Sequence, residues 1–110
     1  MTFERLGETI GSIDGVVEAR SRFADRPAWW SDGREIAHFD QEGVVDIRLT
    51  APVIRKRRAE LAEHAEIAFR ASTGADWLEV TVSDPASERL AVQLVRDAVE
   101  ANRMGPRARK

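Results

Sequence analysis

The sequence of 110 residues contains no cysteine and no tyrosine. Without cysteine the chain has no disulfide, no thiolate metal ligand and no cysteine nucleophile, and tyrosine is equally excluded as a catalytic acid. The motifs of common catalytic and phosphate-binding sites are missing too: there is no glycine-rich phosphate loop, no His-Glu-x-x-His and no serine nucleophile elbow. We therefore predict no catalytic residues and no cofactor.

Long apolar runs are also missing, and neither sign of charge dominates. No run approaches the ~18 residues of a membrane helix, and residues 1–5 lack the basic start and apolar stretch of a signal peptide. The 17 basic and 19 acidic residues give a net charge of −2, which is not typical of nucleic-acid binding. We expect a soluble, cytoplasmic protein that has no membrane partner.

Hydrophobic periodicity predicts three helices in the chain. Apolar residues recur at helical spacing over residues 3–13, 50–63 and 84–103. The length is that of one domain. We expect residues 1–103 to form a single domain and residues 104–110 to form a basic, flexible tail.

Alternation of polar and apolar residues predicts strands between these helices. Residues 16–23 alternate as a half-buried strand does. Asp32-Gly33 predicts a type I′ hairpin in which Trp29 faces Ile36. The order α-β-β-β-α-β-β-α indicates an α+β two-layer sandwich, with an antiparallel sheet of about five strands and helices mainly on one face.

The register of a second hairpin decides which side chains share a face of this sheet. If residues 40–43 form a four-residue loop, Phe39 faces Val44 and Glu35 faces Arg48. The helix-covered face then holds Trp29, Ile36, His38, Val45, Ile47 and Leu49. The open face holds Trp30, Glu35, Ala37, Phe39, Asp46 and Arg48.

Three segments carry a resemblance to a known family. They are Arg-Pro-Ala-Trp-Trp-Ser-Asp-Gly-Arg-Glu-Ile-Ala-His-Phe at 26–39, Asp-Ile-Arg-Leu-Thr at 46–50 and Ala-Asp-Trp-Leu-Glu-Val at 75–80. Together they resemble the small prokaryotic domains called the luciferase family, or luciferase-like domain, over about residues 15–103. The resemblance implies no established chemistry, and the family's name is not evidence of light emission. The arrangement is also similar to the MmcQ/YjbR-like fold.

His38 is the candidate for acid–base chemistry or metal binding, because Glu35, Asp40 and Asp46 are its neighbours. The simpler interpretation is a hydrogen-bonded core histidine, since a lone histidine has no metal-ligand spacing. Members of the family often continue this strand as His-x-His, whereas this chain has Asp40. We therefore predict no metal site.

The residues for which we expect a binding role belong to the sheet. They are Trp30, Glu35, His38, Phe39, Asp46, Arg48, Trp77 and Glu79. Aromatic rings beside an arginine suit a partner protein, a second copy of the chain or a planar ligand. Our leading hypothesis is a small non-catalytic domain that binds a partner, itself included, or a ligand through an open sheet face.

Two alternatives remain. The first is a small-molecule-binding protein or enzyme with its site around His38, Glu35 and Arg48; a concave face would favour a ligand, and a flat one a protein interface. The second is weak nucleic-acid binding through the basic run Arg55–Arg58 and the tail. Acidic residues follow this run closely, so a solvated helix face is the simpler interpretation and nucleic acid is not an expected partner.

Overall fold

The computed structural model describes residues 3–23, 25–70 and 75–103. Three helices and six strands occur in the order α1 (Phe3–Gly11), β1 (Val17–Arg20), β2 (Pro27–Ser31), β3 (Arg34–Gln41), β4 (Val44–Arg48), α2 (Ala51–Leu61), β5 (Ile67–Phe69), β6 (Trp77–Thr81) and α3 (Pro85–Ala101). The predicted basic tail, 104–110, lies outside the described residues.

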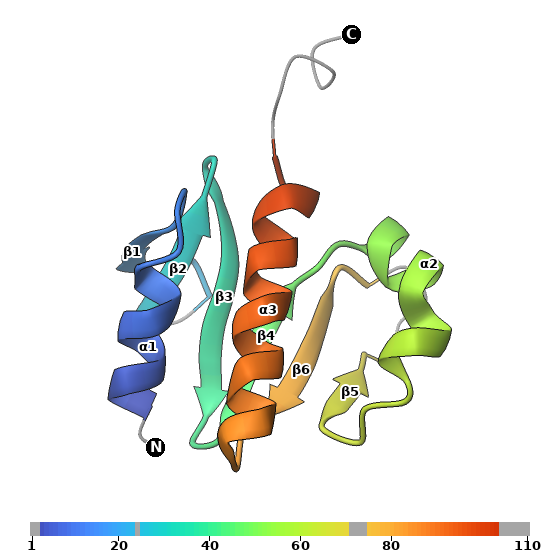
Figure 1. Ribbon diagram of the computed structural model, residues 1–110. Coiled ribbons are helices and arrows are strands. Elements are labelled where there is room, and N and C mark those ends of the chain that lie inside the picture. The colour runs from blue at the N-terminus through green and yellow to red at the C-terminus, as the bar shows by residue number, and fades with distance from the viewer. Residues whose placement is uncertain (1–2, 24, 71–74, 104–110) are drawn as a thin grey trace, which may run out of the picture.

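The predicted α+β sandwich is confirmed. All six strands belong to one antiparallel sheet, in the order β1-β2-β3-β4-β6-β5. Both α1 and α3 lie on the face of the sheet that is turned toward the viewer in Figure 1, while α2 lies beside β5 and β6. No helix among the described residues is long and apolar enough to cross a membrane.

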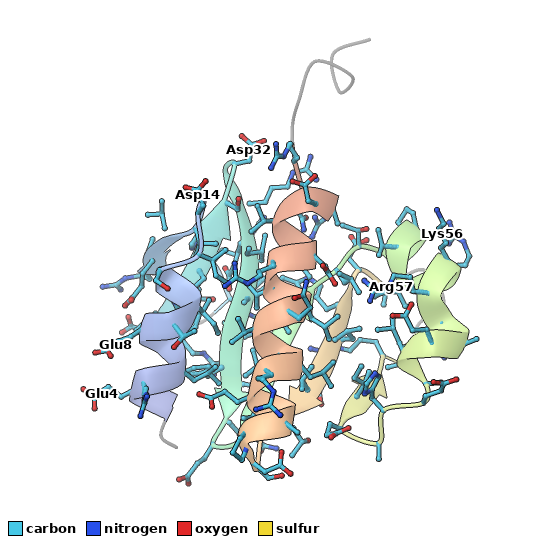
Figure 2. All side chains as sticks on the ribbon, in the orientation of Figure 1. Glu4, Glu8, Asp14, Asp32, Lys56 and Arg57 are labelled. Atoms are coloured by element: carbon cyan, nitrogen blue, oxygen red, sulfur yellow. The ribbon has the colours of Figure 1, made fainter. Side chains whose placement is uncertain are left out.

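The core lies between the sheet and the two long helices. Leu6 and Ile10 of α1 are buried, whereas Glu4 and Glu8 project outward (Figure 2). In α3, Leu94 and Val95 are buried against the sheet. Periodicity placed these apolar stripes correctly, because burying them is the main favourable term in folding.

The first hairpin forms the predicted turn, but the expected pairing of Trp29 with Ile36 is wrong. Asp32 and Gly33 have φ values of 55° and 81°, as a type I′ turn requires. Trp30 pairs with Glu35 as expected, whereas Trp29 pairs with Ala37. Ile36 is thus the extra residue of a β-bulge, which re-aims the side chains that follow it.

The register expected for the second hairpin is also wrong. Phe39 pairs with Val45 and Gln41 with Val44, so that Asp40 is an extra, bulged residue. The connection is the two-residue turn Glu42-Gly43 rather than a four-residue loop. The shift pairs His38 with Asp46, and the expected pairing of Glu35 with Arg48 does not occur.

The prediction of a half-buried strand over residues 16–23 is wrong as well. β1 is an edge strand of four residues, and all four are exposed. The chain leaves the sheet after Arg20, so Ser21 and Phe23 are not strand residues. Their alternating polarity has another cause: Ser21 is buried against Glu35, and Phe23 lies over the open face.

Candidate ligand-binding site

The connection between β1 and β2 folds over the open face of the sheet. The ring centroid of Phe23 lies 5.7 Å from that of His38 and 5.7 Å from that of Trp77, with an edge-on geometry toward Trp77. The His38 and Trp77 rings are 4.9 Å apart. Phe23 is 60% exposed, so the three rings form a cluster that is partly open to solvent.

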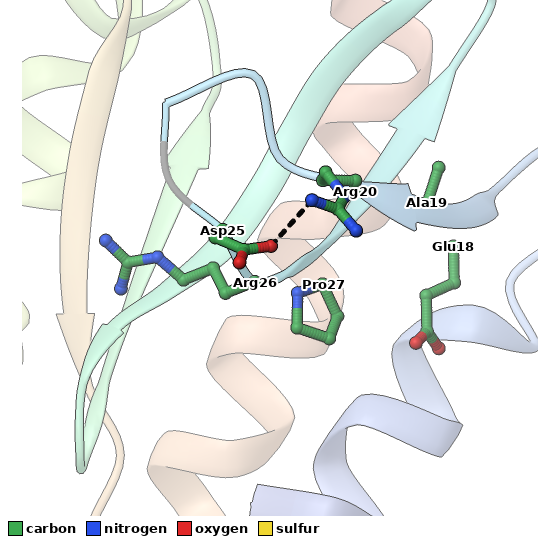
Figure 3. A pocket seen from close by; sticks show the side chains of 6 residues that line it. All are labelled: Glu18, Ala19, Arg20, Asp25, Arg26 and Pro27. Carbon is green, nitrogen blue, oxygen red and sulfur yellow. Dashed lines mark ion pairs between the residues drawn. The ribbon is translucent and has the colours of Figure 1, made fainter.

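One ion pair and two hydrogen bonds fix the ends of this connection. At its start Arg20 forms an ion pair with Asp25, at 2.8 Å, which closes the connection on itself (Figure 3). At its end the Arg26 guanidinium donates to the carbonyls of Phe39 and Asp40, at 2.6 and 2.8 Å. Arg26 therefore binds the bulged end of β3.

A chain of buried hydrogen bonds lies beneath the rings. His38 Nδ1 lies 2.9 Å from Glu35 Oε2, and His38 Nε2 lies 3.0 Å from Asp46 Oδ2. Both carboxylates are buried. Glu35 also accepts hydrogen bonds from the Ser21 hydroxyl and the Arg22 amide, at 2.8 and 2.7 Å. Asp46 Oδ1 is buried and accepts no hydrogen bond from a described residue.

This arrangement favours the protonated form of His38. Burial lowers the pKa of His38, but the hydrogen bonds and negative charges of Asp46 and Glu35 outweigh burial, so that the pKa lies above its ordinary value of 6.5. An imidazolium donates from both nitrogens, as two carboxylate neighbours require. In this state His38 has no lone pair with which to accept a proton.

An open hollow of about 640 Å³ lies over the rings. We call it the ring pocket, and its lining residues are Phe23, Arg26, His38, Asp40, Arg70, Ala75, Asp76 and Trp77. Its volume is within the range of small-molecule sites, ~300–1,000 Å³. The lining combines an aromatic patch with a few charged groups, which is the usual composition of such sites.

A smaller hollow of about 200 Å³ adjoins the ring pocket and shares Phe23 and Trp77 with it. We call it the arginine hollow, and its other lining residues are Arg22, Arg34, Glu35 and Arg48. Arg48 forms an ion pair with Asp76, at 3.0 Å, and donates to Asn102 Oδ1. The two hollows thus have Phe23 and Trp77 as common walls.

A third hollow, lined by Glu18, Ala19, Arg20, Asp25, Arg26 and Pro27, lies at the edge of the sheet (Figure 3). It contains the Arg20–Asp25 ion pair, whose side chains are 76% and 86% exposed. With no aromatic ring and no buried polar group, it is a less suitable ligand site than the ring pocket.

Three carboxylates beside the ring pocket are close enough to hold a metal ion. Oxygens of Asp40, Asp46 and Glu79 lie within 4.8 Å of one another. The Arg70 guanidinium already lies 3.0 Å from Asp46 and 3.7 Å from Glu79, and His38 contacts Asp46 as well. These cations offset the charge that would attract a metal. The absence of a metal site stays a prediction.

The structure brings together most of the residues for which a binding role was expected. Glu35, His38, Asp46 and Trp77 form the cluster described above, and Glu79 joins it through Arg70. The expectation that His38 points away from Asp46 is wrong, because the bulge at Ile36 turns His38 to the open face.

Phe39 lies on the other side of the sheet. Its ring is 5.0 Å from Trp29 and packs against the core, so the expectation that it lines the open face is wrong. Ala37 is likewise buried in the core. Trp30 is half-buried and donates from its indole to the Arg20 carbonyl, at 3.2 Å, apart from the ring cluster. The expected patch of Trp30, Phe39 and Trp77 therefore does not form.

Sequence reasoning missed the residues contributed from outside the regular strands. Phe23, Arg22 and Arg26 belong to the β1–β2 connection, while Asp76 precedes β6. The segment quoted for the family resemblance begins at Arg26, and this was the available signal. Asp76 accepts from the Ala51 amide, at 2.7 Å, and so caps α2 in place of Thr50.

The basic run on α2 is partly paired within the domain. Arg57 forms ion pairs with Glu60 and Asp97, at 3.0 and 2.9 Å. The Arg58 guanidinium lies over the Phe69 ring, 4.2 Å from its centroid. Lys56 projects from α2 (Figure 2). Two of the four cations are thus committed to structural contacts, which weakens the case for nucleic-acid binding.

Comparison with known proteins adds one result. Residues 33–98, from the turn of the first hairpin to α3, match the family described as the luciferase domain. The chain belongs to the luciferase domain family. This confirms the resemblance seen in the sequence. No curated protein and no solved structure matches the chain. The assignment of the candidate site therefore depends on the geometry of this structure.

Proposed function

We propose that this luciferase-domain protein binds a small molecule with a planar ring in the ring pocket. The observation that carries the proposal is an open hollow of about 640 Å³ whose wall includes the packed rings of Phe23, His38 and Trp77. Aromatic side chains prefer planar partners in offset or edge-on contact, each such pair contributing about 0.5–1.5 kcal/mol beyond area burial. A protein with this role suits the cytoplasmic location expected from the sequence.

Binding is favoured over acid–base catalysis by the state of His38. A general base needs a free lone pair within reach of its proton. Both nitrogens of His38 face carboxylates, and its pKa is raised. The imidazolium is therefore a charged ring in the wall of the ligand site and does not act as a base. We therefore retain the interpretation of a non-catalytic domain, with a ligand as the bound species.

The ring pocket is an open hollow, and its mixture of aromatic and charged lining residues favours a ligand over a protein interface. A partner protein was expected to cover Trp30, Phe39 and Trp77, but Phe39 belongs to the helix-covered face.

A different observation supports self-association: all of β1 is exposed at the sheet edge, and Val17 is 64% exposed. An edge strand of this kind is a template for pairing with a second copy. A homodimer through β1 is the second candidate; sedimentation should show it, and Val17→Asp should abolish it.

The ligand proposal is tested with N-phenyl-1-naphthylamine, a neutral ring probe whose fluorescence rises on binding. Phe23→Ala should raise the dissociation constant about tenfold, which is equivalent to ~1.4 kcal/mol, because the ring contacts would be lost. Phe23 is largely exposed, so its removal should leave the fold intact. Val17→Ala removes a similarly exposed apolar side chain outside the pocket and is the matched control. Equal affinities for both variants and the wild type would contradict the proposal.

A further inference from the structure

We infer that the ligand carries an anionic group, a carboxylate, phosphate or sulfonate, and that the arginine hollow holds this group beside the ring. The inference rests on the proposed function, since the hollow adjoins the ring pocket through Phe23 and Trp77. A ring seated against these two side chains would place a substituent directly in the hollow, without a long linker.

Charge gives the first support. The hollow is lined by three guanidinium groups, those of Arg22, Arg34 and Arg48, and by one carboxylate, that of Glu35. Guanidinium groups bind carboxylates and phosphates through paired N–H donors. A hollow of about 200 Å³ has room for one such group.

The existing partners of these charges give the second support. Glu35 directs its oxygens to Ser21, the Arg22 amide and His38, so it is occupied by groups other than the guanidinium groups of the hollow. Arg22 and Arg34 form no ion pair with any residue in the described ranges. Within the described part of the chain, two of the three cations therefore have no ion-pair partner, and an anionic ligand would supply one.

Arg48 has a positioning role in this arrangement. Its ion pair with Asp76 and its hydrogen bond to Asn102 hold the guanidinium in place. Arg34 begins β3 immediately after the hairpin turn. Arg22 lies with its guanidinium 5.7 Å from the Phe23 ring centroid, so that cation and ring are presented together.

The test compares two probes that differ in one group. 1-Anilinonaphthalene-8-sulfonate is N-phenyl-1-naphthylamine with an added sulfonate. The wild type should bind the sulfonate probe at least about tenfold more tightly, and this preference should fall as salt is raised. Arg34→Gln should weaken binding of the sulfonate probe about fivefold and leave the neutral probe unchanged. Arg55→Gln makes the same charge change on exposed α2 and should affect neither.

The outcomes separate the two proposals. Neutral-probe binding that depends on Phe23, combined with equal affinity for the two probes or an equal effect of Arg34→Gln on both, would overturn the anion inference alone. A loss of affinity for the sulfonate probe in Arg55→Gln as large as that in Arg34→Gln would overturn it too, since the effect would then be one of net charge. Neutral-probe binding that ignores Phe23 would overturn the proposed function and this inference with it.

Discussion

The helix-covered face of the sheet and its open face are both buried at their centres, but by different means. Under α1 and α3 the strands present apolar side chains, with Trp29 only 3% exposed against Phe39. On the open face, adjacent residues of the same strands present Glu35, His38 and Asp46. Apolar burial is non-directional and depends on area, whereas buried charges depend on each partner being in place. The stability of the helix-covered face thus depends on buried apolar area, and that of the open face on specific polar partners.

The largest expected effect contrasts one tryptophan from each face. Trp29→Ala should lower the free energy of unfolding by about 3–5 kcal/mol, as is usual for a large buried aromatic. Trp77→Ala should lower it by about 1 kcal/mol, because Trp77 is half-buried and contacts mainly His38 and Phe23. Urea unfolding followed by circular dichroism measures both. Equal losses of stability would show that Trp77 is a core residue, and the two faces would then not differ in how they are stabilised.

The buried charges supply the second contrast. His38→Gln should lower the free energy of unfolding by about 3 kcal/mol at pH 6, because two buried carboxylates lose the cation between them. The exposed histidine, His64, is the control, and His64→Gln should have little effect. If His38→Gln were as stable as the wild type, the Glu35–His38–Asp46 chain would not stabilise the fold.

The same chain predicts a dependence on pH. The pKa of His38 is raised in the folded state, so the stabilisation from its protonation is fully present below about pH 6.5 and is lost as pH rises through the folded-state pKa. The free energy of unfolding of the wild type should therefore fall over this range, and His38→Gln should lack the fall. Urea titrations at several pH values between 6 and 9 measure this difference.

The contrast between the faces also explains what could be predicted from sequence. The helices, the type I′ turn and the core residues of β4 follow from periodicity and local backbone preferences. The bulges at Ile36 and Asp40 leave no such signal, because an extra residue preserves composition and local polarity. Since side chains alternate strictly along a strand, the bulge at Ile36 exchanged the predicted faces of Ala37, His38 and Phe39.

The consequence is clearest for Glu35 and His38. Residues three apart in a regular strand point to opposite faces, and for this reason His38 was expected in the core. The bulge at Ile36 brings both to one face, where they share a hydrogen bond. Phe23 illustrates a second limit: a connection that folds over a sheet is positioned by tertiary contacts, which residues 16–23 do not encode as periodicity.

A smaller effect tests how closely α1 packs on the covered face. A Cβ atom at Gly7 would lie 3.0 Å from Trp29, which is enclosed by Phe39 and cannot easily move. Gly7→Ala should therefore lower the free energy of unfolding by about 1 kcal/mol, within the usual range for overpacking. At Gly11 the nearest atom would be 3.5 Å away, so Gly11→Ala should be neutral or slightly stabilising through helix propensity. Thermal unfolding of both variants measures these changes. A stabilised Gly7→Ala variant would show that the packing between α1 and Trp29 leaves room for a methyl group.

The smallest expected effect has the opposite sign and belongs to the edge of the ligand site. Thr50 has a φ of 79°, a conformation that a β-branched residue rarely adopts, and its side chain makes no capping hydrogen bond. The backbone is held there by Asp76, which accepts from the Thr50 amide through its carbonyl and from the Ala51 amide through its carboxylate. Asp76 also lines the ring pocket and pairs with Arg48, so the strain lies where the site is anchored.

Thr50→Gly should raise the free energy of unfolding by about 1 kcal/mol, because relief of ~1–3 kcal/mol of strain exceeds the ~0.5–1 kcal/mol entropic cost of glycine. Thr50→Ala is the matched control: it keeps the strained backbone and removes a side chain that caps nothing, so it should be nearly neutral. Thermal unfolding of the two variants isolates the backbone contribution. If Thr50→Ala stabilised the protein as much as Thr50→Gly did, the backbone strain at Thr50 would be absent. The open side of the sheet would then have a backbone as unstrained as that of the covered face.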